Sequence, residues 1–121
     1  MTIHELIIIS IVFLLVLIDY ATGVVNAVMH SELSSEKMRR GLGHKFAYLA
    51  IICVALIVEY GSGYINLGIE LPIFIPVCTG VCLIEITSIM ENCAKINPEL
   101  SKSNILNIFK VDKKESDSKE D

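Results

Sequence analysis

The sequence predicts an all-α fold, a small multi-pass membrane protein with three transmembrane helices, a short interfacial C-terminal helix and a disordered charged tail. Two observations indicate it. Hydrophobic residues make up 53% of the 121 residues and gather in long blocks, as membrane spans require. Basic residues crowd between the first two blocks, whereas none lies between the second and the third. We expect a transmembrane domain over residues 1–110, with spans at about 6–29, 46–65 and 71–90, and a charged tail over 111–121.

The first predicted span runs over about residues 6–29 and is interrupted by Asp19. About 24 residues at a rise of 1.5 Å give roughly 36 Å, enough to cross a hydrocarbon core of ~30 Å. An acid at the centre of a span disfavours insertion by roughly 2.5–3.5 kcal/mol, whereas each Leu, Ile, Val or Phe favours it by about 0.3–0.6 kcal/mol. The uninterrupted apolar block over residues 6–18 offsets Asp19. We therefore expect this segment to insert.

The segment between the first two spans, HSELSSEKMRRGLGHK over residues 30–45, is the most basic part of the apolar region. Its four basic residues are Lys37, Arg39, Arg40 and Lys45. We interpret it as a loop that leads into a helix over about residues 35–60, with Ser34 as the N-cap. The apolar stretch 46–58 is short for a span, so the prediction extends it to residue 65 and places a turn at the GSG sequence near Gly61 and Gly63.

The third predicted span begins at Leu71, with Pro72 near the first helical position and Pro76 as a candidate kink. Beyond it, Asn97 and Pro98 have the pattern of an N-cap followed by a first-turn proline. They predict a short interfacial helix that carries four apolar residues, Leu100, Ile105, Leu106 and Phe109. The charged residues from Lys110 onward lack an apolar face, and we predict that they are disordered.

The basic residues also predict the orientation in the membrane. Short loops rich in Lys and Arg stay on the cytoplasmic side. The segment with Lys37, Arg39, Arg40 and Lys45 should therefore set the topology, with the N-terminus outside and the C-terminus cytoplasmic. The expected location is the cytoplasmic membrane.

Polar residues inside the predicted spans are the candidate functional residues. Asp19 and Asn26 lie on one stripe of the first span, and Glu85 and Asn92 lie on one stripe of the third, with Glu91 beside it. Asp19 and Glu85 each lie about 15 residues, or roughly 21 Å, from the outer interface, so they can share one layer. We call these five residues the predicted polar seam, a surface for helix association and for lining an aqueous lesion. The alternative is that each acid is protonated and buried, or reaches toward the headgroups.

Motifs for catalysis or for cofactor and metal binding were not found. The three His residues have no metal-ligand spacing, and the four Cys residues have no second ligand pair beside them. A phosphate-binding loop, a nucleophile elbow and HExxH are all lacking, so the sequence predicts no enzyme activity, no cofactor and no metal. It also has no basic surface laced with aromatic residues, which argues against a nucleic-acid partner.

Three segments in order resemble the phage holin family, the toxin secretion/phage lysis holin group of Gram-positive phages. They are an acid in the first span at Asp19, the Ser-x-Lys-x-x-x-Gly pattern from Ser35 to Gly41, and the E-x-x-S-I-x-E-N pattern from Glu85 to Asn92. The resemblance covers about residues 15–110. One departure precedes Pro98, where the family often carries a Gly.

This resemblance implies a homo-oligomer in the lipid bilayer that forms lesions. Through them a cell-wall hydrolase (an endolysin) or a toxin would leave the cell, without binding stably to the protein, and the host would lyse. Two alternatives from other classes remain open. One is a small multi-pass transporter subunit whose membrane acids bind a proton or a cation, and the other is a scaffold whose basic segment binds anionic lipid.

Overall fold

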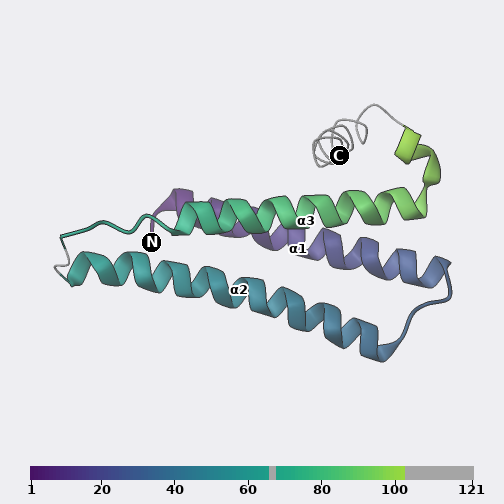
Figure 1. Ribbon diagram of the computed structural model, residues 1–121, viewed down its shortest axis with the longest axis horizontal. Coiled ribbons are helices and arrows are strands. Elements are labelled where there is room, and N and C mark those ends of the chain that lie inside the picture. Colours follow the sequence, from purple (N-terminus) through teal and green to yellow (C-terminus); the bar gives the residue numbers. More distant parts are fainter. Residues whose placement is uncertain (66–67, 103–121) are drawn as a thin grey trace, which may run out of the picture.

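The computed structural model describes residues 1–65 and 68–102. In these residues the chain forms three long helices and one short turn of 3-10 helix. They are α1 (Ile3–Met29), α2 (Ser35–Tyr64), α3 (Phe74–Ile96) and η1 (Pro98–Lys102). The long helices run antiparallel in succession (Figure 1), and each is long and apolar enough to cross a membrane. The all-α prediction with three spans is confirmed.

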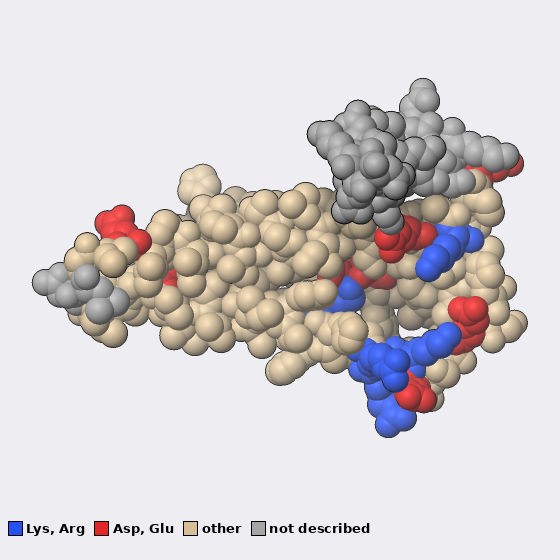
Figure 2. Space-filling model, in the orientation of Figure 1, with Lys and Arg blue, Asp and Glu red and all other residues tan. Residues whose placement is uncertain are grey.

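We call the two ends of this bundle the basic end and the opposite end. At the basic end, α1 ends, α2 begins and α3 ends. Basic side chains gather there, on the first turns of α2 (Figure 2). The opposite end holds the start of α1, the end of α2 and the start of α3. Between the two ends, Figure 2 shows a surface formed almost entirely by uncharged side chains. Such a surface suits contact with lipid tails.

Helix α1 begins earlier than the sequence predicted because its first turn is capped from both sides. Thr2 is the N-cap, and its hydroxyl accepts a hydrogen bond from the Glu5 backbone N–H at 3.3 Å. The Glu5 carboxylate in turn accepts from the Thr2 N–H at 3.0 Å. This capping box satisfies two backbone donors that a helix start leaves free. The apolar run therefore starts inside a helix that is already formed.

Helix α2 differs most from the sequence prediction. Ser34 is its N-cap, as predicted, with the Ser34 Oγ accepting from the Lys37 N–H at 3.1 Å. The predicted turn at Gly61 and Gly63 is wrong, because both glycines lie inside α2. A glycine inside a helix costs only about 1 kcal/mol, whereas a broken helix in lipid leaves several backbone groups without partners. A glycine in the left-handed backbone conformation, Gly68 with φ of 70°, lies instead beyond the end of the helix.

Helix α3 begins at Phe74, three residues after the predicted start, so Pro72 lies before the helix. Pro76 falls in the first turn, where backbone N–H groups have no intrahelical acceptor. Its missing N–H therefore removes no helical bond, and the kink expected there has no cause. The helix continues to Ile96, beyond the predicted end at residue 90.

The region after α3 is described only in part. The Asn97 side chain accepts a hydrogen bond from the Glu99 N–H at 3.2 Å, and Pro98 opens η1. The rest of the predicted interfacial helix, with Ile105, Leu106 and Phe109, lies outside the described residues, as does the predicted disordered tail at 111–121.

An apolar core lies in the half of the bundle nearer the opposite end. It is formed by Val12, Val16, Ile52, Phe74, Cys78 and Val81. Helices α1 and α3 lie side by side, whereas α2 diverges from them toward the basic end (Figure 1). The basic half of the bundle is thus more open and is held together by different contacts.

Candidate functional site: a charge cluster between the three helices

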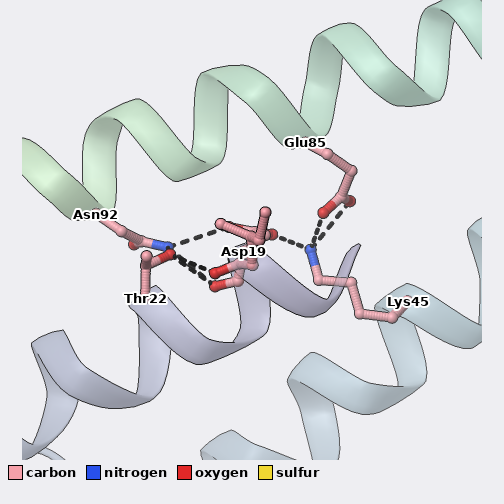
Figure 3. A network of polar contacts seen from close by, with 6 residues as sticks. Asp19, Thr22, Lys45, Glu85 and Asn92 are labelled. Carbon is pink, nitrogen blue, oxygen red and sulfur yellow. Dashed lines mark hydrogen bonds and ion pairs between the residues drawn. The ribbon is translucent and has the colours of Figure 1, made fainter. Parts of the chain in front are cut away.

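One charged side chain from each long helix meets inside the bundle. Asp19 comes from α1, Lys45 from α2 and Glu85 from α3 (Figure 3). Lys45 Nζ donates to Asp19 Oδ2, and it lies 3.0 Å and 2.8 Å from the two carboxylate oxygens of Glu85. Glu85 is 0% exposed, Asp19 4% and the Lys45 side chain 16%. We call these three residues the charge cluster.

An amide extends the charge cluster toward the basic end. Asn92 Nδ2 lies 3.0 Å from Asp19 Oδ1, 3.3 Å from the Asp19 carbonyl oxygen and 3.1 Å from Thr22 Oγ1. The Thr22 hydroxyl lies 2.9 Å from the carbonyl oxygen of Ile18. Both carboxylate oxygens of Asp19 therefore accept from a side chain of another helix (Figure 3). These contacts tie α1 to α3 through an amide and α2 to both through an ammonium.

The position of each residue along its helix explains why the three meet. Asp19 lies ten residues before the end of α1, Lys45 ten residues after the start of α2, and Glu85 eleven residues before the end of α3. At 1.5 Å per residue, each lies about 15 Å from the basic end of its helix. Antiparallel helices of this kind therefore place the three charges in one layer.

The structure assigns Lys45 a position different from the one predicted for it. The sequence grouped it with Lys37, Arg39 and Arg40 as a topology-setting residue near the start of a predicted helix. It does lie in that helix, α2, but its side chain points into the bundle. A lysine can bury its aliphatic stem while its ammonium reaches polar partners, and two carboxylates here supply those partners. The sequence did contain a signal for this position of Lys45. Lys45 lies as many residues after Ser35 as Asp19 lies before Met29, so the two residues lie equally deep from the basic end.

The other three basic residues lie at the exposed start of α2. Lys37 is 3.7 Å from Glu32, and Arg40 is 3.2 Å from Glu36, both as ion pairs between exposed side chains. The Arg39 Nε donates to the carbonyl oxygen of Ser35 at 3.4 Å. Exposed pairs of this kind contribute about 0–1 kcal/mol. They add charge to this end of the molecule rather than holding the bundle together.

The structure brings together only part of the predicted polar seam. Asp19, Glu85 and Asn92 meet, whereas Glu91 is exposed on α3. Asn26 is partly buried, and its enclosed side-chain oxygen has no hydrogen-bond partner within residues 1–65 and 68–102. Among the described residues, no three His, Cys, Asp or Glu side chains are arranged to hold a metal ion. The arrangement joins the three helices through charge.

A comparison with protein families identifies the chain. The family model of the bacteriophage holin family matches residues 4–111. The chain belongs to the bacteriophage holin family. No curated protein and no solved structure matches it. The resemblance seen in the sequence is confirmed, and the match includes all three helices together with the charge cluster. With three helices able to cross a membrane, this holin-family chain is a membrane protein.

Proposed function

We propose that this protein is a holin, a homo-oligomer in the cytoplasmic membrane that forms lesions, releases a cell-wall hydrolase or a toxin, and so causes lysis of the host. The family match carries this proposal. The lipid-facing surface and the buried contacts between all three helices support it, because they describe a compact membrane subunit rather than an enzyme. The released cargo passes through the lesion and does not bind stably to the protein.

The charge cluster has a definite part in this proposal. An unpaired acid is costly in hydrocarbon, and polar contacts between helices add specificity that apolar contacts lack. Asp19 and Glu85 therefore hold the three helices in the arrangement that assembles. Without them the helices would still insert, because the spans become more apolar, but they would not form the subunit that builds lesions.

The test is expression in a bacterial host together with a cytosolic cell-wall hydrolase. Loss of membrane potential and release of the hydrolase are followed. Asp19→Leu and Glu85→Leu should reach membrane levels equal to the unsubstituted protein and yet fail to collapse the potential. Asp19→Asn and Glu85→Gln should keep part of the activity, because a hydrogen-bonding group remains. Glu91→Leu is the matched control, since it removes an exposed acid from the same helix as Glu85.

If both leucine variants of the charge cluster collapse the potential on the normal schedule, these acids have no role in lesion formation. The same assay separates the proposed function from the alternatives. Leakage that does not depend on solute size supports a holin. Saturable flux of one solute would instead indicate a transporter subunit that uses the buried acids, and localisation without leakage would indicate a scaffold.

The proposed topology places the N-terminus outside and the basic end in the cytoplasm. Lys37, Arg39 and Arg40 lie at the basic end, and Lys95 is in the last turn of α3 at the same end. The test uses single cysteines in a Cys-free background. Cysteine at residue 69, near the opposite end, should react with a membrane-impermeant reagent added to intact cells, and cysteine at residue 35 should not. Labelling at residue 35 from outside would reverse the orientation.

A further inference from the structure

We propose that Asp19 and Glu85 bind one proton between them, carried on Glu85, and that this proton exchanges with water at the basic end through a cavity between α1 and α2. The charge cluster would then be a proton-binding site inside the membrane domain. This inference is independent of lysis, because it concerns the protein in its bundle form.

The first argument is the balance of charge. The cluster has two carboxyl groups and one ammonium group, so with all three ionised it carries a net charge of −1. Asp19 and Glu85 are almost fully buried, and Lys45 bonds to both. A buried net charge is expensive in a membrane, and two carboxylates that share one site do not both ionise readily. One added proton makes the cluster neutral.

The second argument assigns the proton to Glu85. Asp19 accepts hydrogen bonds from Lys45 and from Asn92, so its ionised form has donors from two helices. Glu85 accepts from Lys45 and is completely buried, and the same ammonium bonds to both carboxyl groups. Donors stabilise the ionised form of a carboxyl group, and burial favours the neutral form. Asp19 has donors from two helices and Glu85 from one, so the proton is assigned to Glu85.

The third argument is access. A cavity of about 280 Å³ lies between α1 and α2, and Asp19 and Lys45 form its inner part together with Ser88 and Asn92. Figure 2 shows the molecule hollowed at this end, with acidic and basic atoms visible within. The cavity reaches Leu33 and Lys37, next to the connection between the two helices. A space of this size with polar groups at its inner end can hold water.

Small residues keep the cavity open. Gly41 lines it, and a Cβ built on this residue would meet the Tyr20 ring at 4.0 Å. A larger side chain at Gly41 would therefore extend into the cavity. Gly43 lies two residues along the same helix and is exposed, and apart from its own stretch of helix no described atom lies within 4 Å of such a Cβ. A substitution at Gly41 therefore fills the cavity, and the matched substitution at Gly43 does not.

Other titratable groups face the charge cluster or the cavity. Their contributions to the measurement have to be distinguished from that of the carboxyl pair. From α1 the group is Tyr20, and from α2 the groups are Lys37 and His44. From α3 it is Cys82, which neighbours Glu85. His44 is exposed. A His44→Gln background removes its imidazole while the carboxyl pair is measured.

The experiment is infrared spectroscopy of the full chain reconstituted in phospholipid vesicles at neutral pH. The expected result is an absorption band of a protonated carboxyl group, equivalent to one group per chain. Biosynthetic labelling with carboxyl-¹³C glutamate should shift this band, and labelling with carboxyl-¹³C aspartate should not. Because labelling leaves the protein unsubstituted, this measurement does not depend on how any variant folds.

Variants then assign the band to the cluster. Glu85→Gln and Asp19→Asn should each abolish it, because one remaining acid paired with Lys45 is neutral without a proton. Lys45→Met should keep or increase it, since no ammonium balances the acids. Glu91→Gln should leave it unchanged. A spectrum without the band at neutral pH overturns the proposal, as does a band that persists in both Glu85→Gln and Asp19→Asn.

The route is tested by transfer of the vesicles into D₂O. The band should shift as the proton exchanges for deuterium, and Gly41→Leu should slow this shift several-fold relative to Gly43→Leu. Equal exchange rates in the two leucine variants would overturn access through the cavity.

Discussion

Toward the opposite end of the bundle, the three helices meet through Val12, Ile52 and Phe74, which are buried side chains with no polar atoms. Toward the basic end, the same helices meet through an ammonium, two carboxylates and an amide arranged beside a cavity. The two halves belong to the same three helices, yet they use different physical interactions. In one half contacts depend on shape, and in the other they depend on charge and hydrogen-bond geometry.

The difference is instructive because the surroundings are lipid. Lipid tails are as apolar as Leu or Ile side chains, so apolar contacts between helices gain little from the hydrophobic effect and depend on close packing. Lipid tails cannot replace the contact that a charged group makes with a group of opposite charge. Separating the two groups in lipid is therefore costly. The charge cluster should therefore determine how α2 sits against the α1–α3 pair, and the apolar half should adjust more readily to substitution.

The largest effect is expected from Lys45→Met. The change keeps a long aliphatic side chain and removes the ammonium that contacts both Asp19 and Glu85. Removing one partner from a buried ionic network costs about 3–5 kcal/mol. The free energy of unfolding should fall by that amount, measured by unfolding in mixed SDS micelles with energy transfer between fluorophores on α1 and α2. Lys37→Met, at an exposed position, should change it by less than about 0.5 kcal/mol.

A smaller effect is expected from Asn92→Leu. It removes the donor to Asp19 Oδ1 while leaving the contact with Lys45 in place. A buried acceptor left without its partner costs about 1–3 kcal/mol. The same unfolding measurement should show a loss in that range. Thr87→Val serves as its control, because Thr87 is exposed on α3 and its hydroxyl donates to the Leu83 carbonyl oxygen of the same helix. Equal losses for the two variants would contradict a role for Asn92 in joining α1 and α3.

The smallest effect is expected in the apolar half, from Ile52→Val. Deleting one methylene from a close-packed core costs about 0.5–1.5 kcal/mol in water-soluble proteins. In lipid we expect the lower part of that range, because tails can replace part of the lost contact. Ile57→Val is the matched control, since Ile57 is on the same helix and 70% exposed. A loss for Ile52→Val as large as that for Lys45→Met would remove the distinction between the two halves.

Three features of the fold followed from local patterns along the chain. The three apolar blocks predicted three spans, Ser34 predicted the start of α2, and the resemblance around Ser35–Gly41 and Glu85–Asn92 pointed to the family that the comparison shows. The spans and the start of α2 depend on length, hydropathy and capping, which act over a few turns of helix, and the resemblance depends on short motifs. Helix ends were predicted less well, as at Gly61 and Gly63, because the surroundings of a residue decide whether a glycine interrupts a helix.

The sequence by itself determined that this protein is helical, that it is apolar enough for a membrane, and that Asp19 and Glu85 lie at similar depth. Only the tertiary structure decided which basic residue pairs with them. The sequence grouped Lys45 with Lys37, Arg39 and Arg40 because the four lie close together along the chain, and those other three are exposed. Its partners are 26 and 40 residues away along the chain. A pairing at that separation depends on how three helices rotate and pack against each other, and that arrangement has no local signature in the sequence.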